Sequence, residues 1–110
     1  MVEADVRKKI ETYVAQLDTL GVPVSRIVLF GSWARGEAHE WSDIDVVVIS
    51  PVFDEESPRK EIALLWEALV ATGGYIEPIP CGERRWIEDD GSPIIEIARR
   101  EGIEIDLSAA

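Results

Sequence analysis

Hydrophobic residues recur at steps of three and four over the first twenty positions of the chain. They are Val2, Val6, Ile10, Tyr13, Val14, Leu17 and Leu20. This spacing predicts one amphipathic helix with a single buried face. Gly21 and Pro23 follow it and are typical of a helix end.

Two short apolar runs come next and predict strands. Arg26 to Phe30 is apolar on both faces, which suits a buried central strand. Gly31-Ser32 interrupts this run, and Gly36 closes a short turn of helix. The second run, Asp43 to Ile49, is dense in β-branched residues and predicts a second strand, which Ser50-Pro51 ends.

Two further helices are predicted in the second half of the chain. Each begins where a serine that can cap the helix precedes a proline, at Ser57-Pro58 and at Ser92-Pro93. The first is expected to stop at Gly73-Gly74 and the second at Gly102, because glycine commonly ends helices.

Tyr75 to Pro80 predicts a third strand, and Ile103 to Leu107 alternates in the manner of a short final one. Pro78 and Pro80 confine the third strand to a sheet edge or an early end, since proline donates no hydrogen bond. The order of elements predicts an α/β (α+β) fold, a small sheet packed with helices. Residues 1–110 are expected to form a single domain.

The composition is that of a globular protein, with 46% apolar and 30% charged residues. The longest apolar runs have four residues, whereas a membrane span needs about 20. The beginning of the chain lacks a signal-peptide pattern, so we expect a cytoplasmic protein without a membrane partner. Cys81 is the only cysteine, and with the single His39 it cannot build a zinc site of the Cys/His kind.

Charge narrows the range of partners. Twenty-two acidic and eleven basic residues give a net charge of −11. Proteins that bind long nucleic acids usually carry a basic face that neutralises phosphates. A long nucleic acid is therefore not expected to bind this chain directly.

Asp43 and Asp45 carry the first chemical signal. Side chains two positions apart on a strand project from the same face, so the two carboxylates stand side by side while Ile44 points the other way. Adjacent anions repel each other, and a hard divalent cation such as Mg²⁺ relieves that repulsion. Taken alone, the pair is also typical of a solvated strand end.

Gly31-Ser32 carries the second signal. A strand that ends in Gly-Ser and turns into a helix leaves backbone N–H groups free for a phosphate. The Ser32 hydroxyl can donate a further hydrogen bond, although such a turn alone is often only a turn. If the two strands are neighbours, the turn and the carboxylates together describe a site for a metal-bound triphosphate.

The string Gly31-Ser32-Trp33-Ala34-Arg35-Gly36, then five residues, then Ser42-Asp43-Ile44-Asp45 resembles the signature of the nucleotidyltransferase superfamily with the DNA polymerase β fold. More narrowly, the chain is similar to the minimal nucleotidyltransferases. The resemblance implies a polymerase β-like fold with a small mixed sheet. It also implies transfer of a nucleoside monophosphate, AMP from ATP, to an acceptor hydroxyl, with release of pyrophosphate and with two Mg²⁺ ions as cofactors.

The resemblance also assigns the site residues. Asp43 and Asp45 match the metal-binding pair, and a third carboxylate is expected on the next strand. Glu77 is the only acidic residue of the predicted third strand, so we assign it there as metal ligand or general base. The family more often has aspartate, so an exposed edge residue is the alternative, and Glu83, further along, is the next candidate.

Further residues of the signature have open assignments. Arg35 can contact a phosphate of the nucleotide or form an ion pair that fixes the loop. Ser42 is expected to hydrogen-bond the backbone at the strand entry and to keep Asp43 in place. Trp33 and Trp41 flank the site, and they either stack on a base or, as large aromatics near a turn more often do, pack or join an interface.

The resemblance finally suggests a partner. Minimal nucleotidyltransferases pair with helical HEPN proteins in toxin–antitoxin systems, so we expect an antitoxin that acts on a HEPN RNase. One alternative is a catalytically weak binding module that neutralises the RNase by complex formation. Another is a nucleotidyltransferase for a small molecule such as an aminoglycoside. An oligomeric state is compatible with each of these.

Overall fold

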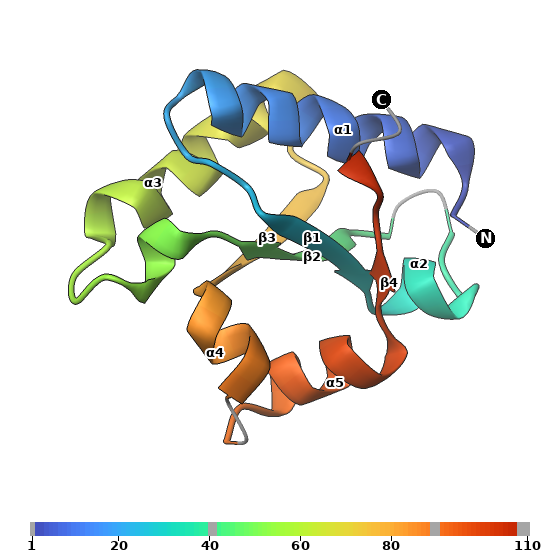
Figure 1. Ribbon diagram of the computed structural model, residues 1–110. Helices are drawn as coiled ribbons and strands as arrows, with labels where there is room; N and C mark the ends of the chain where they lie inside the picture. The colour runs from blue at the N-terminus through green and yellow to red at the C-terminus, as the bar shows by residue number, and fades with distance from the viewer. Residues whose placement is uncertain (1, 40–41, 89–90, 108–110) are drawn as a thin grey trace.

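Helices cover both faces of a four-stranded sheet in the computed structural model, which describes residues 2–39, 42–88 and 91–107 (Figure 1). In chain order the elements are α1 (Ala4–Thr19), β1 (Arg26–Phe30), α2 (Ser32–Arg35), β2 (Ile44–Ile49), η1 (Pro51–Asp54), α3 (Arg59–Glu67), η2 (Ala68–Thr72), β3 (Ile76–Cys81), α4 (Glu83–Glu88), α5 (Pro93–Glu101) and β4 (Ile103–Glu104). Here η denotes a 3-10 helix. No helix in these ranges is long and apolar enough to cross a membrane.

The sheet is mixed, as the sequence predicts. Its strand order is β3-β2-β1-β4, with β2 and β3 parallel and both other pairs antiparallel. In this arrangement the last residue of β1 meets the first residues of β2 and β3 at one end of the sheet. The candidate residues that follow β1 and begin β2 and β3 therefore lie at the same end of the sheet.

The strand pattern divides the core into two layers. Ile44, Val46 and Val48 of β2 join the larger layer with α1, α3 and η2, whereas Val47 and Ile49 join a smaller layer with α4 and α5. In Figure 1, α1 and α3 lie on one side of the sheet and α4 and α5 on the other. Asp45 has the same strand parity as Val47, so its side chain emerges on the face that α4 and α5 cover further along.

Tyr13 ties the larger layer together. It is fully buried in α1, and its hydroxyl donates a hydrogen bond of 2.7 Å to the backbone carbonyl of Leu65 in α3. Burial raises the pKa of the Tyr13 phenol above its usual range. The contact satisfies both polar groups and fixes the register of the two helices.

The two prolines of β3 sit where the sequence places them, at a sheet edge. The carbonyls of Tyr75 and Cys81 accept hydrogen bonds from Ile44 and Ser50 of the β2 segment. Odd-numbered residues of β3 therefore face β2, and Pro78 and Pro80 face the open edge where no donor is needed.

Several boundaries differ from the expectation. The helix predicted from Ser57-Pro58 begins one residue later, with Pro58 as its N-cap, and it tightens into a 3-10 turn after Glu67. The second serine cap is confirmed, since Ser92 Oγ accepts from Ile95 N–H. The final strand keeps only Ile103–Glu104.

α4 was not predicted at all. Its six residues bury only Trp86, so the sequence carries no helical period. Its first turn is capped from a distance, because the Asp54 carboxylate accepts from Arg84 N–H at 3.3 Å. A cap thirty positions away leaves no signal in the local sequence.

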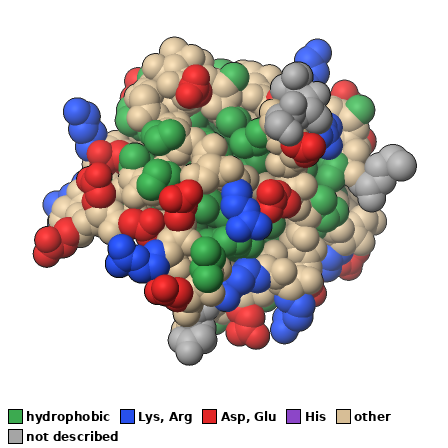
Figure 2. Space-filling view, in the orientation of Figure 1, with side chains coloured by type: hydrophobic (Ala, Val, Ile, Leu, Met, Phe, Trp, Pro, Cys, Tyr) green, Lys and Arg blue, Asp and Glu red, His purple; other side chains and the backbone are tan. Residues whose placement is uncertain are grey.

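Basic side chains are scattered over the face drawn in Figure 2. They lie singly or in small groups, with acidic side chains between them. Charges of both signs are therefore interspersed on this face of the molecule.

Candidate active site

Asp45 lies at the centre of the sheet end where the predicted site residues meet. It is paired in register with Phe30 of β1 on one side and with Glu77 of β3 on the other. Because neighbours in register project from the same face of a sheet, the Asp45 and Glu77 carboxyl groups emerge together. The acidic residue assigned to the third strand is therefore beside the aspartate of the signature.

These acidic groups act strongly on one another. Partial burial, followed by the charges of Glu77 and Asp43 and a hydrogen bond with Glu77, raises the pKa of Asp45 from 3.8 to about 6. The charge of Arg35 opposes the rise but does not cancel it. The three carboxyl groups therefore form an anionic cluster, and a bound cation would relieve their mutual repulsion.

Gly31 brings the backbone turn against this cluster. Its φ of 75° and ψ of −153° fall in a region that only glycine occupies readily. A Cβ at this position would overlap the Asp45 carboxylate, with 3.2 Å remaining even to Cγ. The turn predicted to bind phosphate and the carboxylates predicted to bind metal therefore share one location.

The short helix α2 carries the remaining signature residues. Ser32 is half-buried at its start, and Gly36 ends it in the left-handed conformation, as the sequence predicts. Arg35 is paired with Glu37, Nε to Oε1, and this contact with the fields of Glu101 and Asp45 raises the pKa of its guanidinium. The structure shows Arg35 in an ion pair with Glu37, and its assignment to a nucleotide phosphate stays a prediction. The sequence analysis missed Glu37, which stands in the loop after α2 and outside the signature residues.

Ser42 holds the entry to β2. Its N–H donates to the carbonyl of His39 at 2.9 Å, and His39 N–H donates back to Ser42 Oγ at 3.0 Å. Asp43 follows directly, exposed and just ahead of the strand. Ser42 thus hydrogen-bonds the backbone next to Asp43, in line with the sequence expectation.

The donor chemistry suits a hard cation. Asp43, Asp45 and Glu77 offer only carboxylate oxygens, the ligands that Mg²⁺ prefers. Across residues 2–39, 42–88 and 91–107, no three His, Cys, Asp or Glu side chains converge as a finished metal site. The donors fit by type and by strand position.

Two other sequence candidates lie elsewhere. Glu83 begins α4, beyond the opposite end of β3 from Glu77, so it does not belong to the cluster. Trp41 lies outside the residues that the structure describes.

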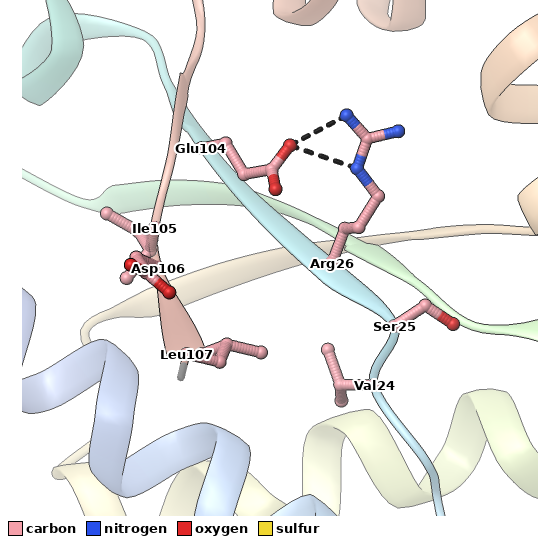
Figure 3. A pocket seen from close by; sticks show the side chains of 7 residues that line it. All are labelled: Val24, Ser25, Arg26, Glu104, Ile105, Asp106 and Leu107. Atoms are coloured by element: carbon pink, nitrogen blue, oxygen red, sulfur yellow. Dashed lines mark hydrogen bonds and ion pairs between the residues drawn. The ribbon is translucent and has the colours of Figure 1, made fainter. Parts of the chain in front are cut away.

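A cavity of about 390 Å³ lies near the far end of β1 and is not part of this site. Figure 3 shows Arg26 and Glu104 turned toward each other there, with hydrogen bonds of 2.9 and 2.7 Å to one carboxylate oxygen. Val24 and Leu107 line the same cavity. The cavity contains this ion pair and the acidic Asp106, and its lining includes none of Asp43, Asp45 and Glu77.

Comparison with known proteins agrees with this geometry. Residues 7–108 match the family described as the nucleotidyltransferase domain. The chain belongs to this family. As a nucleotidyltransferase it takes a nucleoside triphosphate as its substrate, and the mixed α+β fold expected from the sequence is confirmed.

Two solved structures resemble this nucleotidyltransferase in fold. A candidate nucleotidyltransferase from Sulfolobus solfataricus has 17% identity and a TM-score of 0.61, over 90% of this chain and 78% of the other. A toxin–antitoxin structure with AMP-PNP has 21% identity and a TM-score of 0.55, over 87% of this chain and 72% of the other. At these identities the likeness concerns the fold alone.

Proposed function

We propose that this nucleotidyltransferase transfers AMP from ATP, with Mg²⁺, to a hydroxyl of a HEPN partner and thereby acts as an antitoxin. One observation carries the catalytic part. Gly31 lies against Asp45, and Asp45 is paired in register with Glu77. A glycine turn with backbone N–H donors beside paired carboxylates is the kind of arrangement that metal-dependent phosphoryl transfer uses.

Each residue has a defined task in this proposal. Asp43, Asp45 and Glu77 would hold Mg²⁺, which supplies charge neutralisation and alignment of the attacking and leaving oxygens. The Gly31-Ser32 turn binds the triphosphate through its backbone N–H groups and the Ser32 hydroxyl. Arg35 steadies the turn through Glu37 and adds positive charge near Asp45.

The reaction itself is an in-line displacement. The acceptor oxygen attacks the α-phosphorus, a new P–O bond forms, and the bond to pyrophosphate breaks. The hydroxyl proton passes to a carboxylate of the site, for which exposed Glu77 is best placed, and then to water.

Two facts support the partner. The net charge of −11 complements a basic, RNA-binding surface, and one fold neighbour comes from a toxin–antitoxin structure. A second function, neutralisation by binding without transfer, is favoured by the lack of a converged metal site in the described residues. Transfer to a small molecule is a third alternative, which the same assay detects when a candidate small-molecule acceptor replaces the partner.

The test mixes the protein with the product of its neighbouring gene, ATP labelled at the α-phosphate and Mg²⁺. Label should appear on the partner and disappear with Asp43→Asn or Asp45→Asn. Glu104→Gln, which changes a carboxylate outside the site, is the matched control and should label normally. If the wild type and both aspartate variants neutralise the partner equally without label, the protein acts by binding and the transferase proposal is wrong.

A further inference from the structure

The indole of Trp33 connects the phosphate-binding turn to the strand that carries the aspartates. Trp33 belongs to α2, and its ring packs half-buried against the core layer that contains α1. Its Nε1–H donates a hydrogen bond of 3.2 Å to the backbone carbonyl of Ser42. This contact bridges nine residues of chain and lies next to Asp43.

Asp43 depends on its neighbours for its position. Its side chain is exposed, and the residue stands ahead of the regular part of β2. On one side the chain is fixed by Ile44 N–H, which donates to the carbonyl of Tyr75 at 2.8 Å. On the other side it is fixed at Ser42, which hydrogen-bonds with His39 and with Trp33.

Two hydrogen bonds join Ser42 to His39, three positions earlier in the chain. The indole hydrogen bond joins Ser42 to α2 itself. Gly31, at the start of α2, is in turn pressed against Asp45. The backbone next to Asp43 is therefore bonded to α2 through Trp33, and Asp45 lies against the start of α2 at Gly31.

We propose that Trp33 is a positioning residue, whose indole N–H sets the distance between the phosphate-binding turn and Asp43. The inference rests on the proposed function for its catalytic consequence. It replaces the open choice between base stacking and packing that the sequence leaves for Trp33. The ring packs partly against the core, its N–H is bonded to the carbonyl of Ser42, and it also lines a cavity of about 310 Å³ with Lys9. The hydrogen bond assigns the side chain a role through Asp43, and the test below distinguishes this role from stacking of a base in the cavity.

The decisive variant is Trp33→Phe, which keeps an aromatic ring and removes the N–H donor. We expect kcat to fall about tenfold and the Mg²⁺ concentration for half-maximal activity to rise several-fold, as for one lost hydrogen bond. The KM for ATP should stay within about twofold. Trp66→Phe is the matched control, because Trp66 is 53% exposed on α3, and it should leave all three quantities unchanged.

Two other results would overturn the proposal. A rise in the KM for ATP with unchanged metal requirement would show that Trp33 stacks on the base. Unchanged kcat and metal requirement, with only a lower melting temperature, would show that the side chain merely packs.

Measurements without turnover keep the proposal separate from the proposed function. In metal-free wild-type protein labelled with ¹⁵N, the indole N–H of Trp33 should exchange with solvent more slowly than that of Trp66. Mn²⁺ affinity, measured by electron paramagnetic resonance without nucleotide, should weaken several-fold in Trp33→Phe. Both readings remain decisive if the wild type shows no transfer. Equal exchange of the two indoles would overturn the proposal even if the variant does not fold.

Discussion

The two ends of the central sheet differ in how they treat charge. At the end where β1 begins, Arg26 and Glu104 form an ion pair of 2.7 Å that leaves neither group uncompensated. At the other end, Asp43, Asp45 and Glu77 act on one another while the nearest arginine, Arg35, is paired with Glu37. We call the first the closed end, because its charges are paired, and the second the open end, because its negative charges lack a paired cation among the described residues.

This difference separates stability from function. The closed end gains little from its exposed pair, because such pairs contribute between about 0 and 1 kcal/mol. The open end keeps repulsive contacts that a folding-only sequence would avoid, and proteins accept such conflicts mainly at functional sites. Substitutions at the two ends should therefore differ in their effects on activity and stability, and the largest effect is expected at Asp45.

Asp45→Asn should lower nucleotidyl transfer about 1000-fold, since it removes a carboxylate that would hold metal, and metal charge stabilisation is worth several kcal/mol. Glu104→Gln should change the rate less than about twofold. Initial rates with saturating ATP and Mg²⁺ measure both. Equal rates for wild type and Asp45→Asn would remove the functional distinction between the two ends.

Gly31→Ala should lower transfer about 100-fold and destabilise the protein by about 1–3 kcal/mol, because the new Cβ overlaps Asp45 in a backbone region suited to glycine. Gly21→Ala is the control. Gly21 also has positive φ, but a Cβ there meets nothing within 4 Å. It should lose some stability and keep its activity. Chemical denaturation and rate measurements separate the two effects.

Glu77→Gln should reduce transfer about tenfold or more, because it removes one carboxylate of the cluster and keeps the side-chain size. Glu83→Gln, at the opposite end of β3, should be as active as the wild type. Full activity of Glu77→Gln would exclude this residue from the site and leave the aspartate pair as the only assigned ligands.

Asp45→Asn should stabilise the metal-free protein while it abolishes activity. The pKa of Asp45 is raised in the folded state to about 6 from 3.8, so folding favours the protonated form. This favourable contribution is present below about pH 4 and is lost as the pH rises through about 6. Above about pH 7 the variant should be more stable by about 1 kcal/mol, after allowance for solvent screening.

Thermal melts in EDTA measure this effect. The variant should melt roughly 4 °C higher than the wild type above about pH 7, and the gap should narrow toward about pH 4. A gap that does not depend on pH would show that Asp45 carries no repulsion in the metal-free protein.

Arg26→Gln should have the smallest effect, less than about 1 kcal/mol of stability and no change in transfer rate. The Arg26 and Glu104 side chains are 45% and 49% exposed, so water replaces the lost partner. Denaturant titration checks the stability. A large loss of activity would mean that the cavity of Figure 3 belongs to the catalytic machinery.

The sequence predicted the fold where the local pattern carried the information. α1, β1 and the α2 turn follow from residue spacing and glycines, and the edge position of β3 follows from its prolines. The sequence did not predict α4, because the residue that caps it, Asp54, is distant in sequence. Placing Glu77 beside Asp45 requires knowledge of the parallel register between β2 and β3. The hydrogen bond between Trp33 and Ser42 depends on side-chain positions. Residue spacing in the sequence supplies neither.

The most direct test of the central claim counts metal ions bound in the presence of a non-hydrolysable ATP analogue. Electron paramagnetic resonance of Mn²⁺ measures this for the wild type, Asp45→Asn and Glu104→Gln. We predict two saturable ions for the wild type and for Glu104→Gln, and a clear loss for Asp45→Asn. Saturable binding that Asp45→Asn leaves unchanged, or no nucleotide-dependent binding at all, would contradict the assignment of this end of the sheet as the active site.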